Sequence, residues 1–165
     1  MSALAPADGE LRLALRAVLR RALETVAQLA EHLEVTGTAL ARGDSAHLET
    51  YLGHEMALLK QLNDTFGEQH ALLLQQGLTA DRQGLEAAVA RCHDAELASL
   101  WRTLRQALED CRERNRGNAR LAKQSSLNAR SALRVLRGED AETASYGPRG
   151  DVQTSAGGGH SMGRA

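Results

Sequence analysis

Residues 11–40, LRLALRAVLRRALETVAQLAEHLEVTGTAL, decide the fold of this chain of 165 residues. Apolar side chains recur in this stretch at alternating intervals of three and four residues, which places them on one side of an α-helix. The repeating positions are Leu11, Leu15, Val18, Ala22, Val26, Leu29, Leu33, Thr36 and Leu40. All but Thr36 are apolar, so we expect an amphipathic helix over residues 10–42 that buries this stripe against other helices.

Signals at both ends of this stretch agree with a helix. Asp8 is a suitable N-cap, and Gly43 is a suitable residue to end the helix. No proline occurs between Pro6 and Pro148, so nothing in that interval breaks a helix in the way that proline does. We therefore expect helices along most of the chain.

A second helix is predicted from about Asp44 or Ser45 to the stop at Gly77. Gly53 and Gly67 each disfavour a helix interior by about 1 kcal/mol relative to alanine, so a kink is expected near Gly67. The expected buried stripe comprises Leu48, Leu52, Met56, Leu59, Leu62, Phe66 and Leu73, widened by Tyr51 and Leu58.

A third helical region is predicted over residues 79–137, where Gly84 or the stretch 92–94 can divide it into a short and a long piece. The turns between these regions are short, so neighbouring helices should run antiparallel. The predicted fold is all-α, an elongated antiparallel bundle of three long helices over residues 10–138. Residues 1–9 are expected to be a flexible N-terminus, and the Gly-, Ser- and Thr-rich residues 139–165 a disordered tail.

The charge is unevenly distributed. Residues 101–137 hold ten Lys or Arg and three Asp or Glu, a balance of +7, whereas the whole chain has a net charge of -1. A basic helix of this kind can be an ordinary solvated face, pair with acidic groups of the chain, bind an acidic partner or bind nucleic acid. The absence of interleaved aromatic residues and the acidic remainder of the chain argue against nucleic acid.

No arrangement of residues indicates catalysis. His47 and His54 are two helical turns apart, too far for a chelating pair, and Cys92 and His93 diverge as neighbours on a helix. No glycine-rich phosphate loop, membrane span or secretory signal is present. We therefore expect a cytoplasmic protein that is not an enzyme and has no metal or cofactor; its two cysteines fit a reducing compartment.

The last predicted helix loses its apolar stripe. After Leu97, Trp101, Leu104, Leu108 and Cys111, the same repeat falls on Asn115, Asn118, Ala122, Ser125, Ala129 and Ala132 before it reaches Leu136. The composition remains that of a helix. We interpret this part as a helix that binds a partner protein and does not pack in the core of the chain.

Three features together resemble the FlgN family of flagellar type III export chaperones. The first is GDSAHLE at residues 43–49, which opens a helix that continues through LLKQL at residues 58–62. The second is the pair Asn115 and Asn118, followed by Leu121, Ser126, Leu127, Leu133, Leu136 and Gly138. The third is YGPRG at residues 146–150, after a short polar spacer. His54, Glu55 and Met56 stand where a Lys-Glu pair is usual in the family.

The resemblance implies a cytoplasmic, non-enzymatic chaperone for the hook-filament junction proteins of the flagellum. Such chaperones hold the helical C-terminal segment of those subunits unassembled and bring it to the export gate. The implied substrate-protein contacts are Asn115, Asn118, Leu121, Leu127, Leu133 and Leu136. Tyr146 is the implied docking residue for the membrane export-gate protein, and the export ATPase complex is a further candidate partner.

The residues alone leave alternatives open. The four leucines can pack on the first two helices, the two asparagines can fix the register of the bundle, and Tyr146 can be an incidental exposed residue. A structural coiled-coil adaptor or scaffold without an export role is the main alternative function. It predicts self-association of the hairpin over residues 10–76.

Overall fold

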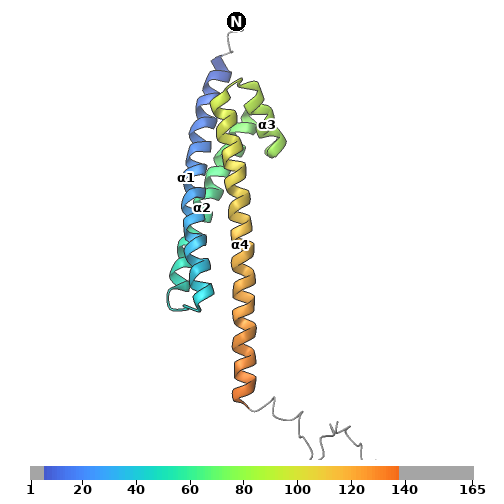
Figure 1. Cartoon of the computed structure of the whole chain (residues 1–165). Coiled ribbons are helices and arrows are strands. Elements are labelled where there is room, and N and C mark those ends of the chain that lie inside the picture. The colour runs from blue at the N-terminus through green and yellow to red at the C-terminus, as the bar shows by residue number, and fades with distance from the viewer. Residues whose placement is uncertain (1–5, 138–165) are drawn as a thin grey trace, which may run out of the picture. The chain divides into compact units, whose positions relative to one another are not determined.

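The structure is a computed structural model that describes residues 6–137, and it has four α-helices in that range. They are α1 (Pro6–Arg42), α2 (Leu48–Gln75), α3 (Arg82–Arg91) and α4 (Ala95–Leu136). The predicted all-α fold is confirmed, but the predicted number of three helices is wrong. The described residues divide into two units, residues 6–123 and residues 124–137. The packing described below lies within the first unit, where α1 and α2 run antiparallel side by side (Figure 1).

The predicted stripe of α1 is confirmed, since every position in it is buried except the half-buried Leu40. The helix begins at Pro6, so Asp8 lies within its first turn and is not the N-cap that we predicted. Proline is favourable at the start of a helix because its missing N–H would have no helical partner there. Gly43 follows the last residue of α1 and has a positive φ of 69°, so it ends the helix at its C-terminus, as predicted.

The predicted stripe of α2 is wrong over its first half, where Leu52, Met56 and Leu59 are exposed by 50%, 71% and 51%. The predicted Leu58, Leu62 and Leu73 are buried, and the prediction is confirmed for them. The other buried positions are Glu55, Thr65 and Gln69, which the prediction did not include. These three are polar or charged side chains, so a search for apolar residues selects the wrong side of the helix there.

Hydrogen bonds explain how two of these polar residues are buried. Glu55 accepts a hydrogen bond from the Thr36 hydroxyl of α1, and the Thr65 hydroxyl donates to the Gln61 carbonyl at 2.9 Å. The helix also starts later than predicted, at Leu48, because the Asp44 carboxylate accepts a hydrogen bond from the Ala46 N–H and holds a turn there. It continues through Gly67 without a break.

The third predicted region is divided at residues 92–94, one of the two places considered. His93 takes a positive φ of 45°, and Asp94 then caps α4 by accepting a hydrogen bond from the Leu97 N–H at 3.0 Å. Gly84, the other place considered, lies inside α3. A Cβ at this position would lie 1.8 Å from the Thr79 carbonyl oxygen, so the close approach of the chain requires glycine.

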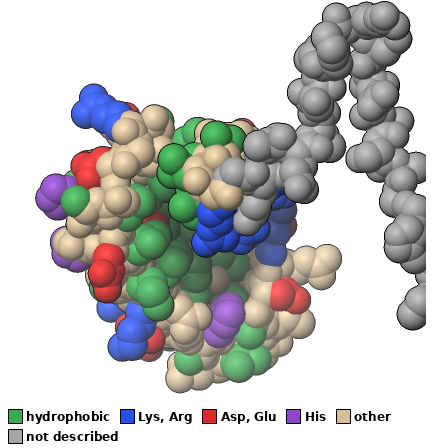
Figure 2. All heavy atoms as spheres, turned by 90° about the horizontal axis from the view of Figure 1, so that it is seen from below, with side chains coloured by type: hydrophobic (Ala, Val, Ile, Leu, Met, Phe, Trp, Pro, Cys, Tyr) green, Lys and Arg blue, Asp and Glu red, His purple; other side chains and the backbone are tan. Residues whose placement is uncertain are grey.

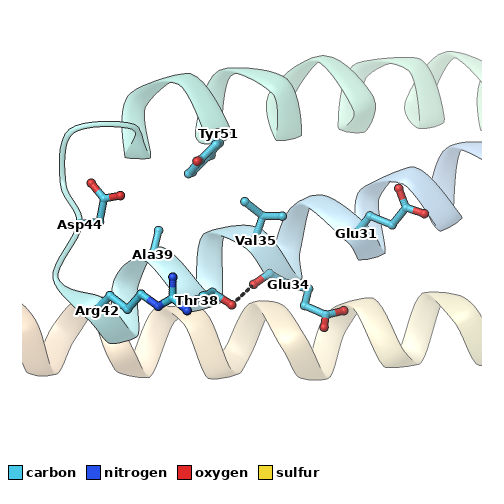
Figure 3. Close-up of a pocket in the computed structure, with 8 residues that line it drawn as sticks. All are labelled: Glu31, Glu34, Val35, Thr38, Ala39, Arg42, Asp44 and Tyr51. Carbon is cyan, nitrogen blue, oxygen red and sulfur yellow. Dashed lines mark hydrogen bonds between the residues drawn. The ribbon is translucent and has the colours of Figure 1, made fainter.

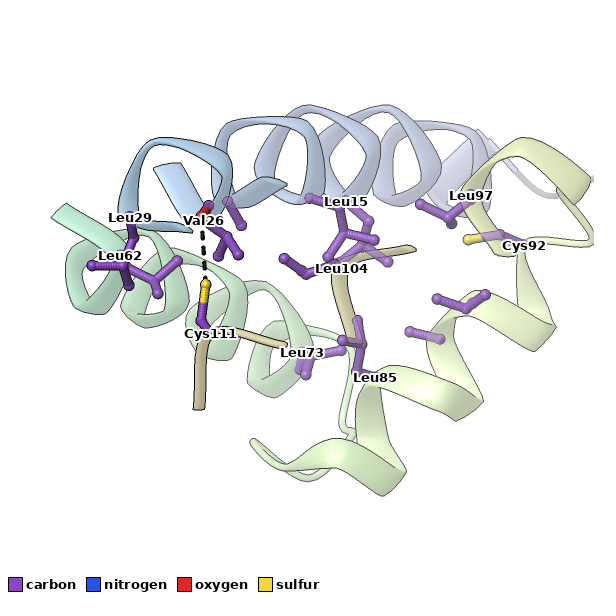
Figure 4. Close-up of a cluster of buried hydrophobic side chains, with 14 of the residues drawn as sticks. Leu15, Val26, Leu29, Leu62, Leu73, Leu85, Cys92, Leu97, Leu104 and Cys111 are labelled. Carbon is purple, nitrogen blue, oxygen red and sulfur yellow. Dashed lines mark hydrogen bonds between the residues drawn. The ribbon is translucent and has the colours of Figure 1, made fainter. Parts of the chain in front are cut away.

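All four helices contribute to one hydrophobic core in the first unit. Its fully buried members include Leu15 and Val26 of α1, Leu73 of α2, Leu85 of α3 and Leu104 of α4. These side chains meet between the helices (Figure 4), where the Cys111 thiol lies 3.7 Å from the Val26 carbonyl oxygen. The last buried residue of α4 is Cys111. The core therefore fixes the first part of α4 and leaves the rest for other contacts.

Replacing Asp94 with alanine should lower the free energy of unfolding at pH 7 by about 1 kcal/mol, because α4 loses its N-cap. The Leu97 N–H, and next Arg16, lower the pKa of Asp94 in the folded protein. A lowered folded pKa stabilises the protein above the unfolded value of about 3.9, and this contribution is lost as the pH falls through the folded value. Urea unfolding should therefore show a difference between the two proteins that shrinks below about pH 4.

The matched control is Asp64→Ala, because Asp64 is an exposed residue paired only with Lys60 of the same helix at 3.8 Å. Exposed pairs of this kind contribute little to stability. An equal effect of both substitutions at pH 7 would contradict the role of Asp94 as a cap.

Candidate functional site

The second part of α4 is the candidate binding element. From Arg112 to Arg137 every residue is exposed except Gly117 and Asn118, which are half-buried. The segment is helical because alanine, arginine, leucine, lysine and glutamine dominate it, and all of them favour helix. It thus keeps its helix without a core of its own, as the sequence predicts.

The two predicted asparagines have different surroundings. The Asn118 amide donates a hydrogen bond of 2.7 Å to the Leu33 carbonyl of α1. A Cβ on Gly37 would lie 2.6 Å from the Asn118 Oδ1, so this glycine lets the asparagine approach α1 closely. Asn115 is exposed and lines a groove of the first unit. Asn118 therefore attaches α4 to α1, which agrees with the register role left open above, whereas Asn115 is accessible.

All four predicted leucines are at the surface. Leu121 is 40% exposed, Leu127 47%, Leu133 51% and Leu136 82%. Val135, which the sequence analysis did not single out, is 65% exposed. Tyr146 lies outside the described residues. Apolar side chains gathered on one helix in this way are typical of a binding surface.

The leucines of the second unit do not all share a face of α4. Successive residues of an α-helix turn by about 100°, so Leu133 and Leu136 lie about 60° apart. Leu127 and Leu136 are nine residues apart and point in opposite directions. A single straight helix on the Leu133 and Leu136 side would not contact Leu127. This difference makes Leu127 a matched control for the other two.

Basic residues accompany the apolar ones. Between residues 112 and 123, five residues are basic, namely Arg112, Arg114, Arg116, Arg120 and Lys123, and Glu113 is acidic. Arg114 pairs with Glu34 of α1 at 2.9 Å, and Arg112 pairs with Glu109 at 3.3 Å. Among residues 6–137, no carboxylate pairs with Arg116, Arg120 or Lys123. These charges favour an acidic partner.

The other features of the surface do not indicate catalysis. A cavity of about 490 Å³ lies between α1 and α2, and Figure 3 shows that Glu31, Glu34, Arg42, Asp44 and Tyr51 are among its lining residues. Their side chains are spread around it and do not converge on one point. Within the described range, no group of three or more His, Cys, Asp or Glu residues could hold a metal ion.

The adjacent cysteine and histidine of the loop before α4 are also separated. Cys92 is buried, whereas His93 is exposed. The second cysteine, Cys111, is buried as well, and burial raises the pKa of its thiol, which disfavours the reactive thiolate. In the same range of residues, no helix is long and apolar enough to cross a membrane.

A model of the family described as FlgN protein matches residues 13–154. The chain belongs to the FlgN family. A solved structure of a flagella synthesis protein FlgN from Pseudomonas aeruginosa is similar to this FlgN family member, with 26% sequence identity and a TM-score of 0.57. The alignment covers 70% of this chain and 91% of that one. The curated proteins contain no match. The resemblance found in the sequence is thus confirmed, and the chain is a member of a flagellar protein family.

Proposed function

We propose that this FlgN family member is a cytoplasmic export chaperone for hook-filament junction proteins. In this proposal α4 binds the helical C-terminal segment of a junction protein and keeps it unassembled. Family membership together with the exposed leucines of α4 is the observation that carries the proposal. An amphipathic helix laid along the Leu133 and Leu136 side of α4 would cover these two leucines and its own apolar side at once.

The magnitudes favour a contact of useful affinity. Full burial of one leucine contributes about 1.5–3 kcal/mol, so two leucines with the partner's own apolar residues can exceed the lower end of the 4–15 kcal/mol that association costs. Arg116, Arg120 and Lys123, which pair with no carboxylate of residues 6–137, would add attraction to an acidic segment and speed its association. A small apolar contact with surrounding charges gives reversible binding, which a chaperone that later releases its partner requires.

The proposal is tested with purified C-terminal segments of hook-filament junction proteins and the full-length chain. The two should form a complex in a pull-down, and the chain should delay assembly of the intact junction subunits. If the full chain retains none of the segments, the proposed function is wrong.

Delivery to the export gate is assigned to the tail. Replacing Tyr146 with alanine should leave binding of the junction segments unchanged and weaken binding to the membrane export-gate protein. An aromatic anchor often carries much of the affinity for a partner pocket, so we expect about a tenfold loss or more. Both affinities can be measured by surface plasmon resonance. Loss of both would show that the two roles are not separate.

A further inference from the structure

The short helix α3 shows how a helix packs between α2 and α4. Its Leu85, Ala88 and Val89 are buried in the core. In Figure 4, Leu85 lies against Leu73 of α2. On its flank, Glu86 lies 3.5 Å from Arg105 of α4. A helix in this position therefore combines an apolar stripe with an acidic residue that faces the arginines of α4.

Beyond α3, no helix of residues 6–137 covers the corresponding side of α2 and α4. Leu59 precedes Leu73 by two heptads and Arg112 follows Arg105 by one, so each pair lies on nearly the same side of its helix. A groove of about 200 Å³ opens there, and six of its lining residues are apolar, namely Leu29, Leu33, Leu59, Leu62, Leu108 and Cys111. Its polar lining residues are Arg112, Asn115 and Glu55, whose carboxylate accepts a hydrogen bond from the Thr36 hydroxyl. With only ten residues, α3 covers one part of this side of α2 and α4 and leaves the groove open.

The rim of the groove extends its apolar surface. Leu52, Met56 and Leu59 follow one another at intervals of four and three residues, which is the spacing of a helix-packing stripe. Each of the three is at least half exposed. Figure 2, which views the molecule from below, shows hydrophobic side chains reaching the surface. Of the three, Leu59 lines the groove itself, and Leu52 and Met56 continue the apolar wall beside it along the exposed side of α2.

The opposite wall is basic. Arg112 lines the groove, and Arg116 follows it by one helical turn. The carboxylate that Arg112 contacts is Glu109 of its own helix, in an exposed pair that a stronger partner can replace. Arg116 has no carboxylate partner among residues 6–137. Arg112 and Arg116 can therefore form ion pairs with an acidic residue of a docked helix, as Arg105 does with Glu86 of α3.

We propose that this groove docks an amphipathic helix of a partner protein, with acidic residues on the flank that faces Arg112 and Arg116. The docked helix lies in the groove as α3 lies beside Leu73, and it extends the bundle along α2 and α4. This surface is separate from the leucines of α4 in the second unit, and the inference does not depend on the partner being a flagellar subunit.

The test uses the full-length chain and two labelled synthetic helical peptides of about 20 residues. Both carry leucines at heptad spacing; one has glutamates on the flank, and the other has lysines at the same places. Fluorescence anisotropy should show that the glutamate peptide binds about tenfold more tightly or better. A double variant, Met56→Gln with Leu59→Gln, should lose about tenfold in affinity or more, since it removes the apolar wall.

The matched control is Leu13→Gln, because Leu13 is 61% exposed on α1 and does not line the groove. It should change the affinity by less than about twofold. Arg112→Glu with Arg116→Glu should reverse the preference toward the lysine peptide. Circular dichroism establishes that each variant is folded.

Several results would overturn the inference. These are the absence of binding, equal binding of both peptides, or full affinity in the Met56 and Leu59 variant. Dimerisation that this variant abolishes would assign the groove to a second copy of the chain. Binding that appears only after removal of residues 138–165 would assign it to the tail. If the glutamate peptide binds and junction segments do not, the proposed function fails and the docking groove stands.

Discussion

A chain that ends at Lys123 should lose all detectable binding of junction-protein C-terminal segments. The truncation removes Leu133 and Leu136, the two exposed leucines that share one side of α4 in the second unit. Burial of these two leucines contributes about 1.5–3 kcal/mol each, so their loss weakens binding by about a hundredfold or more and takes a micromolar complex out of the measurable range. Isothermal titration calorimetry with the purified segments measures the effect.

The first unit should stay folded in this truncated chain. Every residue that is buried within the described range lies at or before Cys111, and Asn118 with its hydrogen bond to Leu33 is retained. The far-ultraviolet circular dichroism per residue should remain that of a helical protein, with cooperative unfolding. Retained binding by a chain that ends at Lys123 would move the client site into the first unit.

Replacing Leu104 with alanine should lower the free energy of unfolding by about 2–5 kcal/mol. Leu104 is fully buried in the core to which all four helices contribute, so the substitution leaves a cavity where they meet. A domain of this size is stable by about 5–15 kcal/mol, and the loss is a large part of that value. Urea unfolding can be followed by the fluorescence of Trp101, the single tryptophan, which is half-buried beside the core.

The comparison variant for this prediction is Leu13→Ala, which makes the same chemical change at a position that is 61% exposed. It should change the free energy of unfolding by no more than about 0.5 kcal/mol. Equal effects at both positions would mean that Leu104 does not lie in the core.

The sequence predicts the fold best where apolar residues alone form the buried stripe. In α1 the buried positions are apolar apart from threonines, so the three-four repeat identifies the correct side of the helix. In α2 the buried side includes Glu55, Thr65 and Gln69, and the exposed side carries Leu52, Met56 and Leu59. Hydrophobicity cannot recognise a buried carboxylate whose partner, Thr36, belongs to another helix.

The candidate site was only partly accessible to sequence analysis. The weak stripe after Cys111 correctly predicts an exposed helix, and the leucines were found. The bond between Asn118 and the Leu33 carbonyl could not be predicted, because it depends on the close approach of α4 to Gly37. The sequence does not predict the groove, because its lining residue Leu59 belongs to the stripe that is expected to be buried in the core.

The most direct test of the client site on α4 is a titration of a junction-protein C-terminal segment into three forms of the full-length chain. These are the native chain, the double variant Leu133→Asp with Leu136→Asp, and the single variant Leu127→Asp on the opposite side of the helix. The double variant should bind at least about a hundredfold more weakly, and Leu127→Asp should bind within about threefold of the native chain. Native affinity in the double variant would contradict the assignment of the client to this face.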